Sequence, residues 1–152
     1  MQTIRLHKKE FTLCGRYSVS ESLKVPGRAS YPINQGVIWK AWDIGNFEKT
    51  QLPDWDVDRQ KYLNICVSEF GFTKRCVKRL TMHPRYIYGC RIGDAGGTNY
   101  RSVIIIESKN PEFNTGAEVK RIVDNHREAL FSFVRDFYGA IPALPRTMER
   151  GF

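Results

Sequence analysis

Basic side chains are concentrated in one stretch of this 152-residue sequence. Residues 70 to 93 contain six lysines and arginines but no aspartate or glutamate. Four of the six form two adjacent pairs, Lys74 with Arg75 and Lys78 with Arg79. Positive charge at this density binds phosphate groups, because ion pairs with phosphates release condensed counterions, and it also matches an acidic protein surface. The net charge of +8 for the whole chain favours a polyanionic partner as well.

A second candidate site follows the apolar run 103–106, where Glu107 and Lys109 come after Asp94 in the chain. This order resembles the Asp…Glu-x-Lys site of metal-dependent nucleases, in which the carboxylates hold a divalent ion and the lysine orients the attacking water. In the other interpretation, Asp94 is a turn residue, and Glu107 and Lys109 are the solvated end of a strand. A metal-dependent nuclease that uses these three residues is therefore kept as an alternative function.

Two helices are predicted to position the basic pairs. The first lies within residues 52–70, where three aspartates precede a helical apolar pattern that Gly71 ends. Thr73 is a suitable N-cap for a second helix that runs to about Met82. At 3.6 residues per turn, the four basic residues share one side of this second helix and Val77 lies on the other side.

This order of elements resembles the helix-turn-helix family of DNA-binding proteins, in which the turn glycine stands between two apolar residues, here Phe70 and Phe72. The resemblance implies that five positions face DNA: Thr73, Lys74, Arg75, Lys78 and Arg79. The strands predicted on either side of the glycine-rich turn 93–99 resemble the hairpin, or wing, of the winged helix-turn-helix group, which contacts the adjacent groove or backbone. The resemblance implies that the basic residues of this wing are Arg85, Arg91 and Arg101.

The clearest helical pattern lies in the last third of the chain. Thr115 and Glu118 form a predicted capping box, and an apolar stripe then continues for about six turns until Gly139. Such a stripe packs on its own domain or on a second copy, and in winged-helix regulators a long terminal helix often serves in dimerisation. A homodimer through the helix that begins at Thr115 and ends at Tyr138 is therefore predicted, and residues 140–152 are predicted to be a loosely ordered tail.

The patterns together predict an α+β fold made of four segments. Residues 1–35 are a β-rich segment with a loop, and residues 36–108 are the winged helix-turn-helix-like unit. Residues 109–139 are the C-terminal amphipathic helix, and residues 140–152 are the tail. Within the unit, residues 36–47 carry an apolar cluster that favours a short helix over a buried strand.

Composition limits the class of protein. The chain is 41% hydrophobic, with no apolar run of membrane-spanning length. Its N-terminal residues carry charges where a signal peptide has an apolar core, so a cytoplasmic protein is expected. The four cysteines are widely spaced, without a Cys-x-x-Cys pair, so reduced thiols are expected and neither a metal nor a cofactor is predicted.

These observations predict a non-catalytic protein that binds double-stranded DNA, used for transcriptional control or for recognition of a replication or partition site. Two other functions remain open. One is the metal-dependent nuclease, and the other is an assembly or inhibitory protein that docks its basic side on an acidic partner.

Overall fold

A six-stranded sheet is the centre of the computed structural model, which describes residues 2–7, 10–24, 30–94, 100–113 and 115–137. The strand order is β3-β2-β1-β6-β5-β4, and each neighbouring pair is antiparallel. The bounds of the strands are Gln2–His7 (β1), Glu10–Arg16 (β2), Ser30–Pro32 (β3), Asn46–Lys49 (β4), Tyr86–Gly93 (β5) and Tyr100–Ser108 (β6). Because β1 pairs with β6, the N-terminal β-rich segment shares one sheet with the unit predicted for residues 36–108.

The predicted hairpin exists, but it does not have the position of a wing. Strands β5 and β6 pair from Tyr86 opposite Ser108 to Gly93 opposite Tyr100. Each strand also has a neighbour on its other side, β4 beside 87–90 of β5 and β1 beside 102–105 of β6, so the middle of the hairpin lies within the sheet. The reason is the apolar run in β6, where both Ile104 and Ile105 are buried although they point to opposite faces. A run that is apolar on both faces needs a layer on each side.

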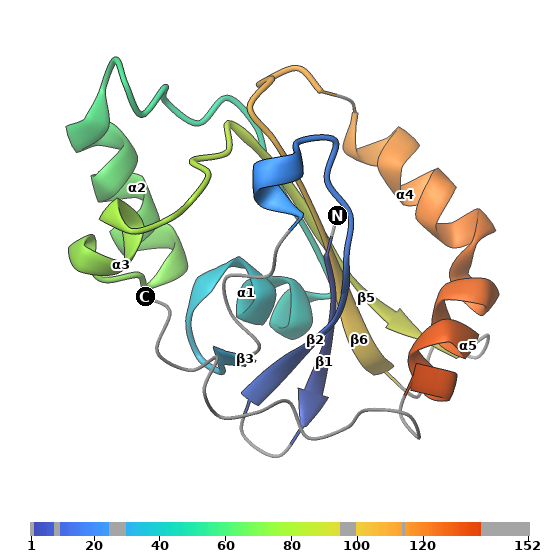
Figure 1. Cartoon of the computed structure of the whole chain (residues 1–152). Coiled ribbons are helices and arrows are strands. Elements are labelled where there is room, and N and C mark those ends of the chain that lie inside the picture. Colours follow the sequence, from blue (N-terminus) through green and yellow to red (C-terminus); the bar gives the residue numbers. More distant parts are fainter. Residues whose placement is uncertain (1, 8–9, 25–29, 95–99, 114, 138–152) are drawn as a thin grey trace.

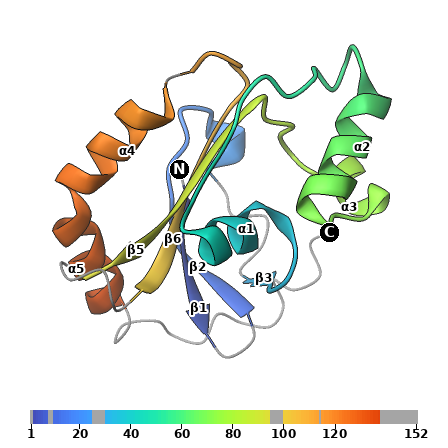
Figure 2. The same ribbon diagram turned by 180° about the vertical axis from the view of Figure 1, so that it is seen from behind.

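Helices cover both faces of the sheet, as Figures 1 and 2 show from opposite sides. One face carries α1 (Gly36–Ile44), α2 (Arg59–Phe70) and α3 (Lys74–Lys78), and the other carries α4 (Gly116–Asn125) and α5 (Arg127–Phe137). A short 3-10 helix, η1, spans Glu21–Leu23. The fold is therefore α+β, as predicted, with a central antiparallel sheet between two helical layers.

Helix α1 confirms the helix predicted near residue 36 and lies very close to the sheet. It ends at Ile44, and Gly45, with φ of 91°, turns the chain into β4. The close approach occurs at Gly89 in β5, where a Cβ atom would lie 2.7 Å from Ala41 Cβ and 2.8 Å from Ile105 Cδ1. Glycine at this position is what allows α1 to pack on the strand.

The C-terminal helix begins where the capping pattern predicts but is divided in two. The Thr115 hydroxyl accepts a hydrogen bond from the Glu118 backbone N–H at 3.3 Å. Helix α4 then ends at Asn125, and its C-cap His126, with φ of −110° and ψ of 10°, leaves the helical region before α5 begins. Val119, Val123 and Val134 are buried, so part of the apolar stripe packs within its own chain. Dimerisation through this segment stays a prediction, and Tyr138 and the tail lie outside the described residues.

Candidate functional site

The turn between α2 and α3 has the geometry that the glycine predicts. Asp58, not an earlier aspartate, is the N-cap of α2, and its side chain accepts a hydrogen bond from the Lys61 N–H at 3.0 Å. At the other end, Gly71 adopts the left-handed conformation with φ of 66°. The Gly71 N–H donates to Val67 O at 3.2 Å and the Phe72 N–H donates to Cys66 O at 3.3 Å. These two bonds close the last turn of α2 and aim the chain into α3.

Helix α3 begins at the predicted cap but is shorter than predicted. The Thr73 hydroxyl accepts a hydrogen bond from the Cys76 N–H at 3.1 Å, and the helix ends at Lys78 rather than near Met82. The carbonyl oxygen of Val77 explains the early end. It accepts from the Leu80 N–H at 3.2 Å and from His83 Nε2 at 2.9 Å, so it is not paired with the N–H four residues on, as a continued α-helix requires.

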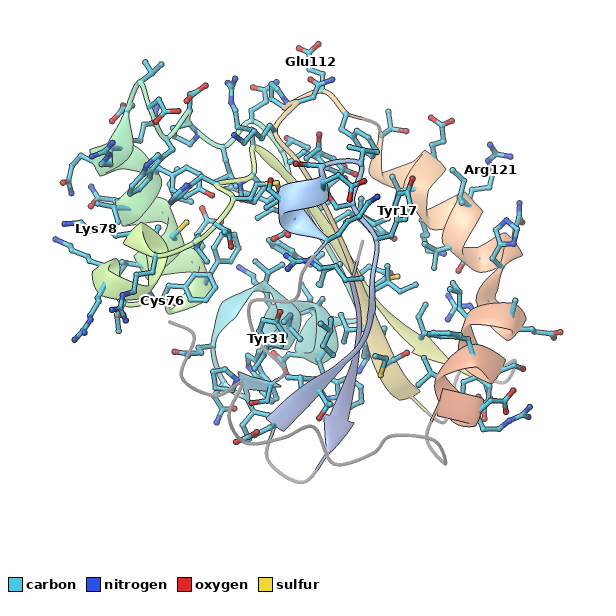
Figure 3. The ribbon with its side chains drawn as sticks, in the orientation of Figure 1. Tyr17, Tyr31, Cys76, Lys78, Glu112 and Arg121 are labelled. Atoms are coloured by element: carbon cyan, nitrogen blue, oxygen red, sulfur yellow. The ribbon has the colours of Figure 1, made fainter. Side chains whose placement is uncertain are left out.

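The basic residues on and directly after α3 form an exposed surface, called here the α3 basic surface and made of Lys74, Arg75, Lys78 and Arg79. At 100° per residue these side chains span an arc of about 140°. Val77 projects from the opposite side of α3 and is 0% exposed in the core beneath α2. None of the ion pairs among the described residues involves these four side chains. Figure 3 shows Lys78 pointing away from the body of the protein.

Two of the predicted wing residues, Arg85 and Arg91, pack against the fold. Arg85 is half-buried, donates from Nε to Leu52 O at 3.2 Å, and has Nη1 3.8 Å from Asp54 Oδ2. Arg91 is also half-buried and lies against Gly45, where a Cβ atom would be 3.1 Å from its Nη2. Both arginines therefore contact the fold itself, because β5, which carries Arg91 and directly follows Arg85, is part of the central sheet. The side chain of Arg101 lies outside what the structure describes.

The three residues of the nuclease hypothesis do not share one site. Glu107 lies opposite Ile87 in β5, whereas Asp94 follows Gly93 at the far end of the same strand. Seven residues of extended strand separate Asp94 from Ile87, which is about 23 Å. One metal ion cannot bridge that distance with ligand bonds of about 2.3 to 2.6 Å. Within the described part of the chain, no group of three or more potential metal-ligating side chains occurs.

Glu107 instead lines a cavity that no pattern in the sequence had indicated. The cavity has a volume of about 310 Å³ and lies between the sheet and the helices α1 to α3. Burial raises the pKa of Glu107, and the Arg16 guanidinium, which also lines the cavity, acts in the opposite direction. A signal for the orientation of Glu107 was present in the sequence. Side chains alternate between the two faces of a strand, so Glu107 lies on the same face of the sheet as Val103 and Ile105.

Two of the four cysteines are packing groups of the core. None of the four is in a disulfide, as predicted, and Cys14, Cys66 and Cys90 are buried. Burial raises the pKa of the Cys66 and Cys90 thiols to about 11. These two side chains are therefore neutral near pH 7 and behave as packing groups.

Comparisons with known proteins add no relative on which a function could be based. No protein-family model matches the sequence, and no curated protein or solved structure was found to match it. Among the described residues, no helix combines the length and the apolar character needed to cross a membrane. A function is therefore inferred from the α3 basic surface and from the side chains around it.

Proposed function

We propose that this protein binds double-stranded DNA through the α3 basic surface and catalyses no reaction on it. The observation that carries the proposal is the exposure of four cations on one side of a capped helix, with no ion pair to an acid among the described residues. Unneutralised lysine and arginine gain most from phosphate, because binding releases counterions from the nucleic acid. Transcriptional control and binding to a replication or partition site are both uses of such a surface.

The order α2, glycine turn, α3 supports a helix-turn-helix mode of docking, in which the early residues of the second helix enter the major groove. Arg75 and Lys78 are the candidates for base edges, and Arg79 is a candidate for phosphate. Five helical residues have a length of only about 7.5 Å, so few base pairs can be read. We therefore expect phosphate contacts to dominate affinity. Arg85 and Arg91 contact the fold and are assigned no base edge.

A second candidate function is docking of the same surface on an acidic protein. The shortness of α3 and the position of β5 and β6 in the middle of the sheet favour this alternative, because both features limit reading of a groove. Acidic side chains on a partner would match the surface by charge alone.

A paired binding experiment tests the proposal. Selection from a random duplex pool, followed by fluorescence anisotropy with the recovered duplexes, is compared with binding to a panel of acidic proteins at the same ionic strength. DNA binding with Kd in the micromolar range or tighter, weakened by Lys78→Ala and unchanged by Arg121→Ala, supports the proposal. Arg121 is a suitable control because it is exposed on α4, across the molecule from Lys78 (Figure 3). Binding to acidic proteins without binding to duplex would establish the second candidate instead.

A further inference from the structure

The cavity beneath α3 has the character of a small-molecule site. Its inner wall is made of side chains that are buried, among them Tyr62, Cys66, Phe70, Ile87 and Ile105. Arg79 and Thr81 also line it and are exposed, so the cavity reaches from the surface into the core. A volume of about 310 Å³ is at the lower end of the range for ligand pockets, which are mostly apolar with a few placed polar groups. A fused aromatic ring system is of suitable size.

Glu107 is the one acidic side chain among the residues that line this cavity. It is half-buried on β6, beside Ile87 of β5, on the face of the sheet that α1 to α3 cover. None of the ion pairs among the described residues uses it. A carboxylate in such surroundings costs free energy unless donors satisfy its oxygens.

Arg16 and Arg79 decide what kind of donor suits this carboxylate. Both arginines line the same cavity, and the Arg16 guanidinium favours the ionised form of Glu107. Their positive charge would repel a ligand that carries a net positive charge. A ligand whose neutral N–H groups point at Glu107 satisfies the carboxylate without that repulsion. Two such N–H groups side by side match the two oxygens of a carboxylate.

We infer that this cavity binds a small, flat aromatic molecule that carries an edge of adjacent N–H donors, with that edge paired to the Glu107 carboxylate. The apolar walls from Phe70, Ile87 and Ile105 cover the ring, and Glu107 sets its orientation. Cys76 of α3 lines the cavity as well, so the ligand lies directly behind the α3 basic surface. Ligand binding itself does not depend on whether that surface binds DNA.

Two probes of almost equal shape test the inference on the full chain. 2-Aminobenzimidazole has the donor edge, and 2-methylbenzimidazole replaces its amino group by a methyl group. Both are used at a pH above the pKa of their protonated forms, so that each is uncharged and the two differ only in the donor edge. Each is titrated into isotopically labelled protein while amide resonances are followed by NMR. We expect 2-aminobenzimidazole to shift the Ile87 and Ile105 amides with Kd on the order of 1 mM or tighter, and roughly tenfold tighter than the methyl analogue.

Glu107→Gln should remove most of that preference, because one of its oxygens is replaced by a donor. Glu112→Gln is the matched control, since it makes the same change of charge at an exposed residue that does not line the cavity (Figure 3). The inference is overturned if neither probe gives saturable shifts up to about 10 mM. It is also overturned if the two probes bind the unmodified chain equally well, and this comparison does not require any variant to fold. Retention of the full preference by Glu107→Gln would overturn it too.

Discussion

The Trp55 and His83 rings are stacked face to face, with centroids 3.9 Å apart and planes 8° from parallel. The Arg59 guanidinium lies 4.8 Å from the centroid of the Trp55 ring, so the stack includes the first residue of α2. His83 Nε2 donates to the Val77 carbonyl at 2.9 Å. His83 therefore joins the loop before α2 to the end of α3 and determines where the α3 basic surface stops.

The stack predicts a pH dependence of stability. Burial lowers the pKa of His83, and the hydrogen bond to Val77 offsets this only in part. The unfolded chain then binds a proton near pH 6.5 where the folded chain does not. The contribution of neutral His83 to the free energy of unfolding is fully present above about pH 6.5. It decreases as the pH drops toward the pKa of His83 in the folded chain. Urea unfolding between pH 5 and pH 7.5 should show this slope.

His83→Gln should flatten that slope, because the amide does not titrate in this range. His126→Gln is the control, since His126 is exposed at the junction of α4 and α5 and makes no ring stack in the described structure. Equal slopes for the unmodified chain and for His83→Gln would show that His83 does not couple folding to pH.

Gly71 offers a test of the turn between the two helices. Its φ of 66° is unfavourable for a residue with a Cβ atom, although a Cβ atom at this position would meet nothing closer than Gln35 Cβ at 4.0 Å. Gly71→Ala should therefore cost about 1 kcal/mol through backbone conformation alone. Gly71→Asn should cost less, because asparagine tolerates the left-handed region better. Chemical denaturation measures both, and equal stability of all three proteins would show that this conformation does not limit the turn.

Gly89 tests the packing of α1 on the sheet by a different mechanism. A Cβ atom at this position would lie 2.7 Å from Ala41 Cβ, so Gly89→Ala forces α1 away from β5 and should destabilise the fold by about 1 to 3 kcal/mol. Gly15→Ala is the matched control in β2. Its Cβ atom would contact the Phe133 ring at 3.7 Å, an ordinary contact distance, and we expect a change within about 0.5 kcal/mol. A neutral result for Gly89→Ala, measured by urea unfolding, would contradict the close approach.

Local features of the chain could be predicted from the sequence because neighbouring residues determine them. The caps at Thr73 and Thr115 and the helix end at Gly71 depend on side chains within four positions. The exposed side of α3 could also be predicted from helical spacing, and the burial of Val77 confirms which side of the helix faces the core. The early end of α3 was missed, because the group that ends it, His83, belongs to the loop beyond the helix.

Long-range pairing could not be read from the same patterns. The pairing of β1 with β6 joins residues about one hundred positions apart, and it is this pairing, with that of β4 and β5, that places the hairpin inside a sheet. A hairpin pattern is the same in a wing and in a sheet centre. The cavity beside Glu107 was missed for a related reason, since its walls come from four strands (β2, β3, β5 and β6) and all three helices of one layer.

The central claim is that the α3 basic surface binds duplex DNA through phosphate contacts, and a salt titration tests it most directly. The association constant of a fluorescent duplex is measured by anisotropy from about 50 to 200 mM salt for the unmodified chain and for Lys74→Ala/Arg79→Ala. Each lost phosphate contact reduces the slope of log K against log salt by about 0.9, so the double variant should bind more weakly with a slope smaller by about two. Equal affinity and equal slope in a double variant that keeps its circular dichroism spectrum would contradict the account.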